Sequence, residues 1–267
     1  MRSTAKPIKN SVNAARTPRS PSRGRPATVH LRQRVVPAKA SETPSLQRKA
    51  APKADYTSHE RLRQILSALD QLFPQAQCAL QHDNAFQLLV ATILSAQCTD
   101  ERVNKVTPGL FQKYPTPEDF AAVSQPALET EIRSTGFFRN KAKNIIGMAK
   151  KLMADFGGQV PRTMEEMLTL PGVARKTANV VLGTAYGLAT GIVVDTHVFR
   201  IARRLKLSNQ ETPEKVEQDL LKLVPRERWI LFGHQIIWFG RKVCQARKPL
   251  CADCPLEPIC DSRDKTA

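Results

Sequence analysis

Lys176 and Asp195 are the two residues of this sequence whose type and position suggest chemistry. Lys176 stands in the first turn of a helix expected over residues 174–186, directly after the turn dipeptide Pro171-Gly172. The positive end of a helix dipole disfavours another positive charge, so a lysine amine there is more easily neutral. A neutral amine is a nucleophile, although an ordinary surface lysine is the alternative interpretation.

Asp195 follows an apolar run, Ile192 to Val194, and precedes Thr196-His197. Packing alone would not choose an acidic residue at this position. The alternative is an ordinary N-cap for a helix over residues 196–205. Both interpretations remain open from the residues alone.

A short helix over residues 163–168 is expected before the Pro171-Gly172 turn, because Thr163 and Glu166 form a capping box. The local pattern is therefore helix, hairpin, helix. Backbone N–H groups at the start of the second helix lack partners within the helix and point outward. Such a helix end is a suitable site for a phosphate.

Four of the six cysteines, Cys244, Cys251, Cys254 and Cys260, have the spacing C-x6-C-x2-C-x5-C. Four thiolates so close in sequence indicate a metal site. Zinc is one candidate, but zinc ribbons usually use two short pairs and this loop has one C-x2-C. Without a secretory signal a disulfide framework is not expected. The other two, Cys78 and Cys98, are expected to be isolated buried thiols.

The rest of the folded chain is predicted to be all-α, since no useful stretch alternates with a period of two. His234 is expected to be a structural histidine in the last helix. A helix beginning after a Thr57–Glu60 capping box contains Leu62 to Leu72 at helical spacing. Further helices are expected over 86–96, the most buried one, and over 102–114, 117–123, 126–134, 141–156, 213–224 and 228–243.

The positive charge of the chain is concentrated at its N-terminus. The formal net charge is +17, and residues 1–54 hold thirteen Lys and Arg but one acidic residue, so this segment carries +12. The excess indicates a polyanionic partner. The segment is rich in Pro, Ser and Arg and is expected to be disordered. It is interpreted as a DNA-holding arm, an organelle-targeting peptide or a solubilising tail.

The motifs together resemble the endonuclease III family, the bifunctional branch of the helix-hairpin-helix DNA glycosylases. Four separated features carry the resemblance: LPGVARKTANVVL with Lys176, VDTHVFR with Asp195, LSAQCTD upstream, and the four-cysteine loop. They span residues 57–264. One departure is Ala174, where the hairpin of the family usually has a second glycine.

The resemblance implies roles for several residues. Lys176 would be the Schiff-base nucleophile, with Asp195 as its carboxylate partner, and the four cysteines would hold a [4Fe–4S] cluster. Gln97 would fill the space left by a flipped nucleotide, and Phe137 would wedge into the base stack. The alternatives are that Gln97 begins the solvated side of the next helix and that Phe137 and Phe138 are core residues. The other expected DNA contacts are Leu170, Pro171, Gly172, Val173, Ala174, Arg175, Arg247 and Lys248.

The resemblance also implies a domain organisation: a disordered basic tail over 1–56, an iron–sulfur cluster domain over 57–77 plus 190–264, and a helical barrel domain over 78–189 that contains the helix-hairpin-helix. The expected fold is the all-α, two-domain fold of the helix-hairpin-helix DNA glycosylases, with a C-terminal loop that holds the [4Fe–4S] cluster.

The implied activity is removal of oxidised pyrimidines from double-stranded DNA, followed by β-elimination at the abasic site. The protein is expected to act as a monomer in the bacterial cytoplasm, at the nucleoid, or in mitochondria or the nucleus if the tail is a targeting segment. No stretch approaches the ~20 apolar residues that span a membrane. The rivals are an adenine glycosylase relative, which normally lacks the lysine, and a non-enzymatic helix-hairpin-helix binding module.

Overall fold

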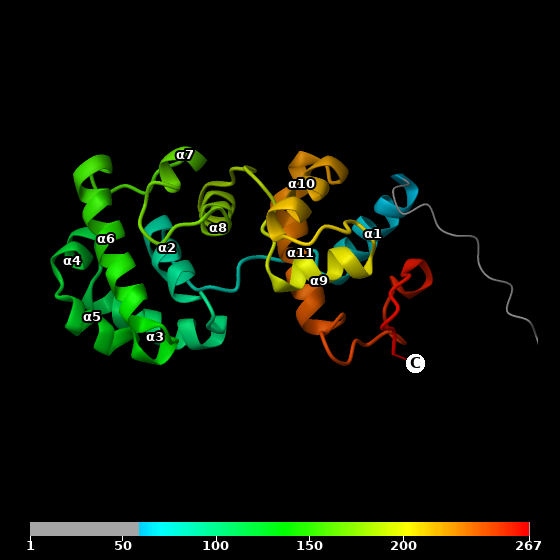
Figure 1. The fold of residues 1–267 in the computed structure, drawn as a ribbon, viewed down its shortest axis with the longest axis horizontal. Coiled ribbons are helices and arrows are strands. Elements are labelled where there is room, and N and C mark those ends of the chain that lie inside the picture. The colour runs from blue at the N-terminus through cyan, green and yellow to red at the C-terminus, as the bar shows by residue number, and fades with distance from the viewer. Residues whose placement is uncertain (1–58, 267) are drawn as a thin grey trace, which may run out of the picture. The chain divides into compact units, whose positions relative to one another are not determined.

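A computed structural model describes residues 59–266, and within that range all regular structure is helical (Figure 1). The predicted all-α fold is therefore confirmed. The predicted basic tail over 1–56 and the predicted Thr57 cap lie outside the described residues. Among the helices of residues 59–266, none is long and apolar enough to cross a membrane.

Within residues 59–266, seven α-helices surround a first core, which consists of the buried apolar residues from Leu80 to Leu182. Eight of the ten residues of α2 are buried, because this helix is apolar on nearly every side, as expected. The helices are α2 (Ala85–Leu94), α3 (Asp100–Lys113), α4 (Pro117–Ala122), α5 (Gln125–Ile132), α6 (Phe138–Phe156), α7 (Met164–Met167) and α8 (Arg175–Tyr186).

Four α-helices of the described part of the chain surround a second core, which combines Ile65 and Leu69 with buried apolar residues from Ile192 to Leu256. They are α1 (His59–Leu72), α9 (Thr196–Arg204), α10 (Pro213–Leu223) and α11 (Trp229–Lys242). Figure 1 shows α1 beside the α9–α11 group, far from its neighbours in sequence. Arg61 fixes it there by donating to the carbonyl oxygens of Leu205 and Ile259, each at 2.8 Å.

Side-chain caps begin several of the helices. Asn84 accepts from the Gln87 backbone N–H at 2.9 Å and starts α2. Thr116 starts α4 through a reciprocal capping box with Asp119. Ser124 occupies the N-cap position of α5 but makes no side-chain capping bond.

Several helix boundaries differ from the prediction, and two of these differences lie beside Gln97 and Phe137. Helix α6 begins at Phe138, three residues before the expected Lys141, and α2 ends at Leu94 rather than at residue 96. The turn before α6 is made by Gly136 and Phe137, whose φ angles are +70° and +47°. A left-handed phenylalanine is uncommon, so helical periodicity could not locate this boundary.

Candidate active site and cysteine cluster

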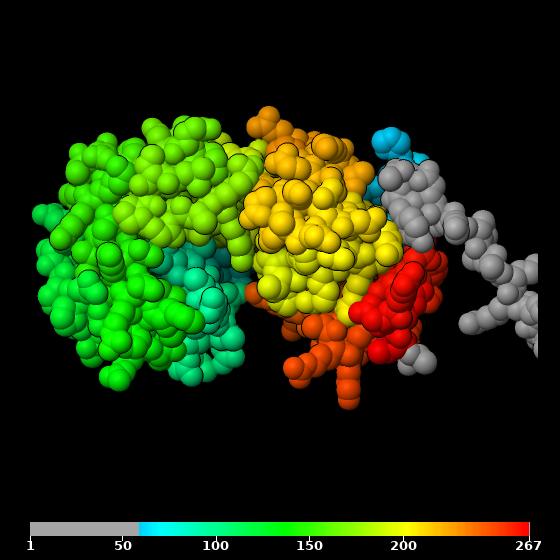
Figure 2. All heavy atoms as spheres, in the orientation of Figure 1, coloured from blue at the N-terminus to red at the C-terminus, as the bar shows by residue number. Residues whose placement is uncertain are grey.

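Lys176 and Asp195 line the same cavity, which has a volume of about 220 Å³. Lys176 comes from α8 on the first core, and Asp195 comes from the start of α9 on the second. The segment 77–80, Gln97 and part of α11 also line this cavity. Figure 2 shows the surface hollowed between the atoms of the first core, in green, and those of α9, in yellow.

Lys176 is the second residue of α8, and its side chain is exposed. It has no hydrogen-bond or ion-pair partner among residues 59–266. The N-cap residue Ala174 also makes no side-chain capping bond. The amine and the first amides of the helix therefore face the solvent side of the hairpin without an internal partner.

Asp195 is both the N-cap of α9 and part of the cavity wall. Its Oδ1 accepts hydrogen bonds from the backbone N–H groups of His197 at 2.8 Å and Val198 at 2.9 Å. Within the described range, Oδ2 has no hydrogen-bond partner. Oδ1 thus fixes the position of the carboxylate, whereas Oδ2 remains available to interact with positive charge.

Two histidines lie near these groups, and burial lowers the pKa of each below the ordinary value. His197 follows Asp195 closely, and its Nδ1 is 3.3 Å from Nη2 of Arg200. His234 lines the cavity, with Nε2 3.5 Å from Oγ1 of Thr184. Because burial favours the neutral imidazole, neither ring adds a full positive charge near neutral pH.

The hairpin between α7 and α8 is packed onto the first core by its apolar side chains. Leu170 and Val173 are 3% and 8% exposed, so DNA could reach their backbone rather than their side chains. Gly172 has φ +76°, and an added Cβ would lie 2.7 Å from Cβ of Asn144. Ala174 has φ −96°, so the methyl group in place of the family's second glycine causes no backbone strain.

Arg175, an expected DNA contact, has its side chain engaged within the protein. Its guanidinium donates to both oxygens of Glu217, at 2.8 and 3.2 Å. The buried Glu217 also accepts from Nδ2 of Asn179 at 2.9 Å. This network ties α8 to α10, and any phosphate contact of Arg175 falls to its backbone N–H.

Gln97 and Phe137 share an unusual conformation, because both are exposed and both have positive φ, +52° and +47°. Gln97 lines the cavity, whereas Phe137 does not. Phe137 is 63% exposed, so the alternative that both phenylalanines are core residues is wrong; Phe138 alone packs against the first core. An exposed aromatic ring on a turn is available to enter a base stack.

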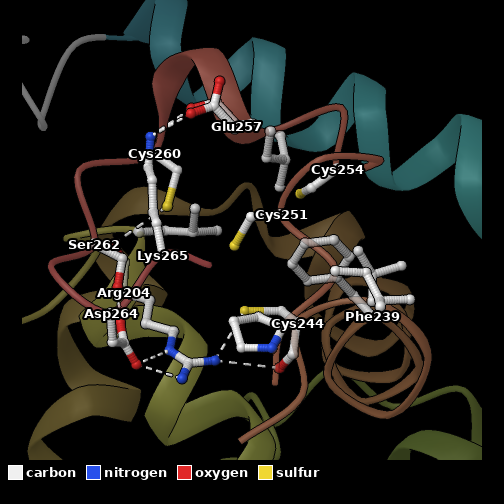
Figure 3. Close-up of a pocket in the computed structure, with 15 residues that line it drawn as sticks. Arg204, Phe239, Cys244, Cys251, Cys254, Glu257, Cys260, Ser262, Asp264 and Lys265 are labelled. Atoms are coloured by element: carbon white, nitrogen blue, oxygen red, sulfur yellow. Dashed lines mark hydrogen bonds and ion pairs between the residues drawn. The ribbon is translucent and has the colours of Figure 1, made fainter. Parts of the chain in front are cut away.

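The four cysteines of the C-terminal loop surround one small cavity of about 30 Å³, and Figure 3 shows their sulfur atoms turned toward it. Apolar side chains complete much of its lining, among them Phe239 and Leu256. Nη1 of Arg204 lies 3.3 Å from Sγ of Cys244. The sequence-predicted cluster of thiols is thus assembled in space.

Within residues 59–266, no group of three His, Cys, Asp or Glu side chains is placed to hold a metal ion. The four cysteines around the cavity nevertheless supply four thiolates, which is the donor set of an iron–sulfur cluster. The chemistry of these ligands therefore fits such a group.

The other predicted residues of this part of the chain are placed as follows. Arg247 and Lys248 are exposed in the loop between the first two cysteines of the cluster. Cys78 and Cys98 are free thiols, partly exposed rather than fully buried as expected. Cys78 lines the cavity of Lys176, and burial raises the pKa of its thiol.

Sequence reasoning missed three further residues of the cavity wall: Asp100, Trp238 and Arg241. Arg241 on α11 donates to Asp100 on α3 at 2.5 Å. Trp238 donates its indole N–H to the carbonyl oxygen of Gln77 at 3.1 Å. The partners are separated by 141 and 161 residues in sequence, and no local spacing pattern could have paired them.

Comparison with known families defines the class of protein. Residues 90–226 match the family model described as HhH-GPD superfamily base excision DNA repair protein. This range contains the hairpin, Lys176 and Asp195. The helical fold and the cavity are therefore those of a base excision repair protein with a helix-hairpin-helix.

Individual relatives narrow the class. The chain is 54% identical over 218 residues to endonuclease III of Synechocystis sp., covering 82% of this chain and 97% of the relative. It is 40% identical to endonuclease III of Escherichia coli, with coverage of 76% and 95%. A solved structure of a trapped endonuclease III–DNA covalent intermediate matches with a TM-score of 0.74 and 46% identity, covering 76% of this chain and 96% of that one. The chain belongs to the endonuclease III family, whose members are DNA glycosylases and AP lyases of base excision repair.

Proposed function

We propose that this protein removes oxidised pyrimidines from duplex DNA and cleaves the strand through a Schiff base on Lys176. The observation that supports this is the shared cavity, which brings an unpaired lysine and a carboxylate from different cores to one place. A 46% identical relative has been trapped as a covalent complex with DNA, which is the behaviour expected of an amine nucleophile.

The damaged nucleotide would leave the base stack and enter the cavity, at a cost of a few kcal/mol that is lowest for a weakly stacked lesion. Gln97 and Phe137 would occupy the gap in the duplex. The hairpin amides, with Arg247 and Lys248, would bind phosphates and set the register without reading sequence.

Lys176 would then attack the anomeric carbon of the sugar. A carbon–nitrogen bond to the lysine forms while the glycosidic bond breaks, and its electron pair leaves with the base, which takes up a proton. Positive charge develops on the sugar during this step, and the carboxylate of Asp195 stabilises it. The sugar ring opens as the lysine adduct becomes an imine.

The imine acidifies the neighbouring proton on C2′, and a base removes it. Its electron pair forms a C2′–C3′ double bond, and the C3′–O bond breaks, so the 3′ phosphate departs. Hydrolysis of the imine returns the free amine of Lys176. This β-elimination cuts the strand on the 3′ side of the lesion.

We also propose that Cys244, Cys251, Cys254 and Cys260 hold a [4Fe–4S] cluster. The support is the convergence of four thiols on one cavity, together with their spacing C-x6-C-x2-C-x5-C in the sequence. When bound, the cluster would supply iron–thiolate bonds that fix the loop carrying Arg247 and Lys248. Four protein ligands leave no open position for substrate, so its role is structural.

The proposed domains are the helical barrel over 78–189 and the cluster domain over 57–77 plus 190–264. The separation of the two cores supports this division, because α1 packs with the helices that follow residue 190. We propose a monomer that acts on DNA in the bacterial nucleoid.

Borohydride trapping on duplex DNA containing thymine glycol tests the proposal. The wild type should give a covalent adduct, because borohydride reduces the imine. Lys176→Gln should abolish trapping while DNA binding is largely retained. Trapping that persists in Lys176→Gln would overturn the assignment of the nucleophile. A duplex with adenine opposite 8-oxoguanine should give no excision, which separates this activity from that of the adenine glycosylases.

A further inference from the structure

Lys141 on α6 is a buried lysine that the proposed reaction does not use. It is 5% exposed, and its Nζ donates to the backbone carbonyl oxygens of Leu94 at 2.7 Å and Thr135 at 2.8 Å. Among residues 59–266 it forms no ion pair with a carboxylate. Burying an ammonium group is costly unless its surroundings compensate for the lost water.

The two carbonyl groups belong to the two segments that carry the exposed left-handed residues. Leu94 is the last residue of α2, three positions before Gln97. Thr135 ends the short helix η1 (Arg133–Thr135), two positions before Phe137. Lys141 is thus bonded to the start of both turns at once, although the turns are about forty residues apart in sequence.

Both turns need support, because their conformations are unfavourable by themselves. A residue other than glycine with a left-handed backbone costs roughly 1–2 kcal/mol and persists only where the surrounding structure holds it. The Leu94 carbonyl lies at a helix C-terminus, where an ammonium group interacts favourably with the dipole. The lysine therefore fixes the exit of α2 and the entry to α6 relative to each other.

We propose that Lys141 is a positioning residue that holds the Gln97 turn and the Phe137 turn at a fixed separation, so that both side chains enter the DNA together. This inference rests on the proposed function, in which these two residues fill the gap left by the flipped nucleotide. Lys141 itself stays buried and does not touch DNA.

Lys141→Met tests this, because methionine keeps an unbranched side chain but cannot donate to either carbonyl. The matched control is Lys150→Met, which removes an exposed lysine from the same helix. Two rates are compared under single-turnover conditions: excision of thymine glycol from duplex DNA, and strand cleavage at an abasic site in single-stranded DNA, where no base stack must be entered.

The duplex rate of Lys141→Met should fall at least 10-fold, while its single-strand rate and both rates of Lys150→Met should change less than about 3-fold. When Lys141→Met binds the duplex, the fluorescence of a 2-aminopurine base beside the lesion should no longer increase. Equal losses on both substrates, or no loss, would overturn the inference. If wild-type protein gave no trapped adduct, the proposed function would fail instead.

A double-mutant cycle on Gln97→Ala and Phe137→Ala covers the case in which Lys141→Met does not fold. With Lys141 intact, the two turns should act as one unit, so the double variant should lose less duplex activity than the product of the two single losses. Losses that multiply independently would show that the turns are not coupled, and the inference would fall.

Discussion

The carboxylate of Asp195 accepts a 2.8 Å hydrogen bond from the backbone N–H of His197 while it lines the cavity of Lys176. The same side chain therefore starts helix α9 and faces the proposed reaction. Capping requires an oxygen acceptor, whereas stabilising positive charge on the sugar requires a negative charge. The two roles can be separated by substitution.

Asp195→Asn should keep the cap and lose the charge. We expect its free energy of unfolding to change by less than about 0.5 kcal/mol, because Asn and Asp are similar N-caps. The rate of excision should fall at least ~100-fold. Asp195→Ala should lose the same activity and also about 0.5–2 kcal/mol of stability. Urea unfolding and single-turnover excision measure the two effects, and an active Asp195→Asn would remove the carboxylate from the mechanism.

Gly191→Ala should disrupt the network that joins α8 to α10. An added Cβ would contact the Oε1 of Glu217 and lie 2.6 Å from Nδ2 of Asn179, and neither group can move without breaking its hydrogen bonds. The expected loss is about 1–3 kcal/mol in urea unfolding. The control is Gly109→Ala in α3, where nothing lies within 4 Å. It should be neutral or stabilise by up to about 1 kcal/mol, and equal effects of the two would contradict the packing argument.

His234→Gln should weaken the dependence of stability on pH. Burial lowers the pKa of His234 in the folded protein, so the unfolded chain binds more protons below about pH 6.5. The free energy of unfolding should therefore fall as the pH falls from 7.5 to 5.5, by at most ~1.4 kcal/mol per pH unit for this group. The variant should lose less over this interval. His197, whose pKa is lowered in the same direction, keeps part of the dependence. Parallel curves for variant and wild type would rule out the contribution of His234.

Cys254→Ser should remove one ligand of the proposed cluster. We expect the purified wild type to be coloured and to contain about four iron and four sulfide per chain. The variant should lose iron, colour and thermal stability. Cys98→Ser, outside the C-terminal loop, should keep all three. A colourless wild type with one zinc per chain would contradict the cluster.

The sequence alone located most of the helices and the residues of the proposed chemistry. Caps such as Asn84 and Thr116 act through neighbours three residues away, and such short-range signals are readable in a sequence. The hairpin before Lys176 was predicted for the same reason. The four cysteines were also predicted, because all lie within one short loop.

The parts that escaped prediction depend on contacts between distant segments. The ion pair between Arg175 and Glu217 joins residues that are 42 positions apart, and no local pattern predicts it. Lys141 fits the apolar stripe of α6 only because two carbonyl groups from other segments receive its amine. Helix α6 starts directly after Phe137, whose left-handed backbone is not signalled by helical periodicity.

The position of α1 imposes an order on the folding of the two cores during translation. Arg61 on this helix bonds to Leu205 and Ile259, which are translated 144 and 198 residues later. All residues of the first core are translated before Leu205 and Ile259. The first core can therefore fold while Ile65 and Leu69 of α1 are still uncovered. The second half can close only after Ile259 has been translated, and a ribosome that stalls before that point leaves the apolar side chains of Ile65 and Leu69 exposed to aggregation.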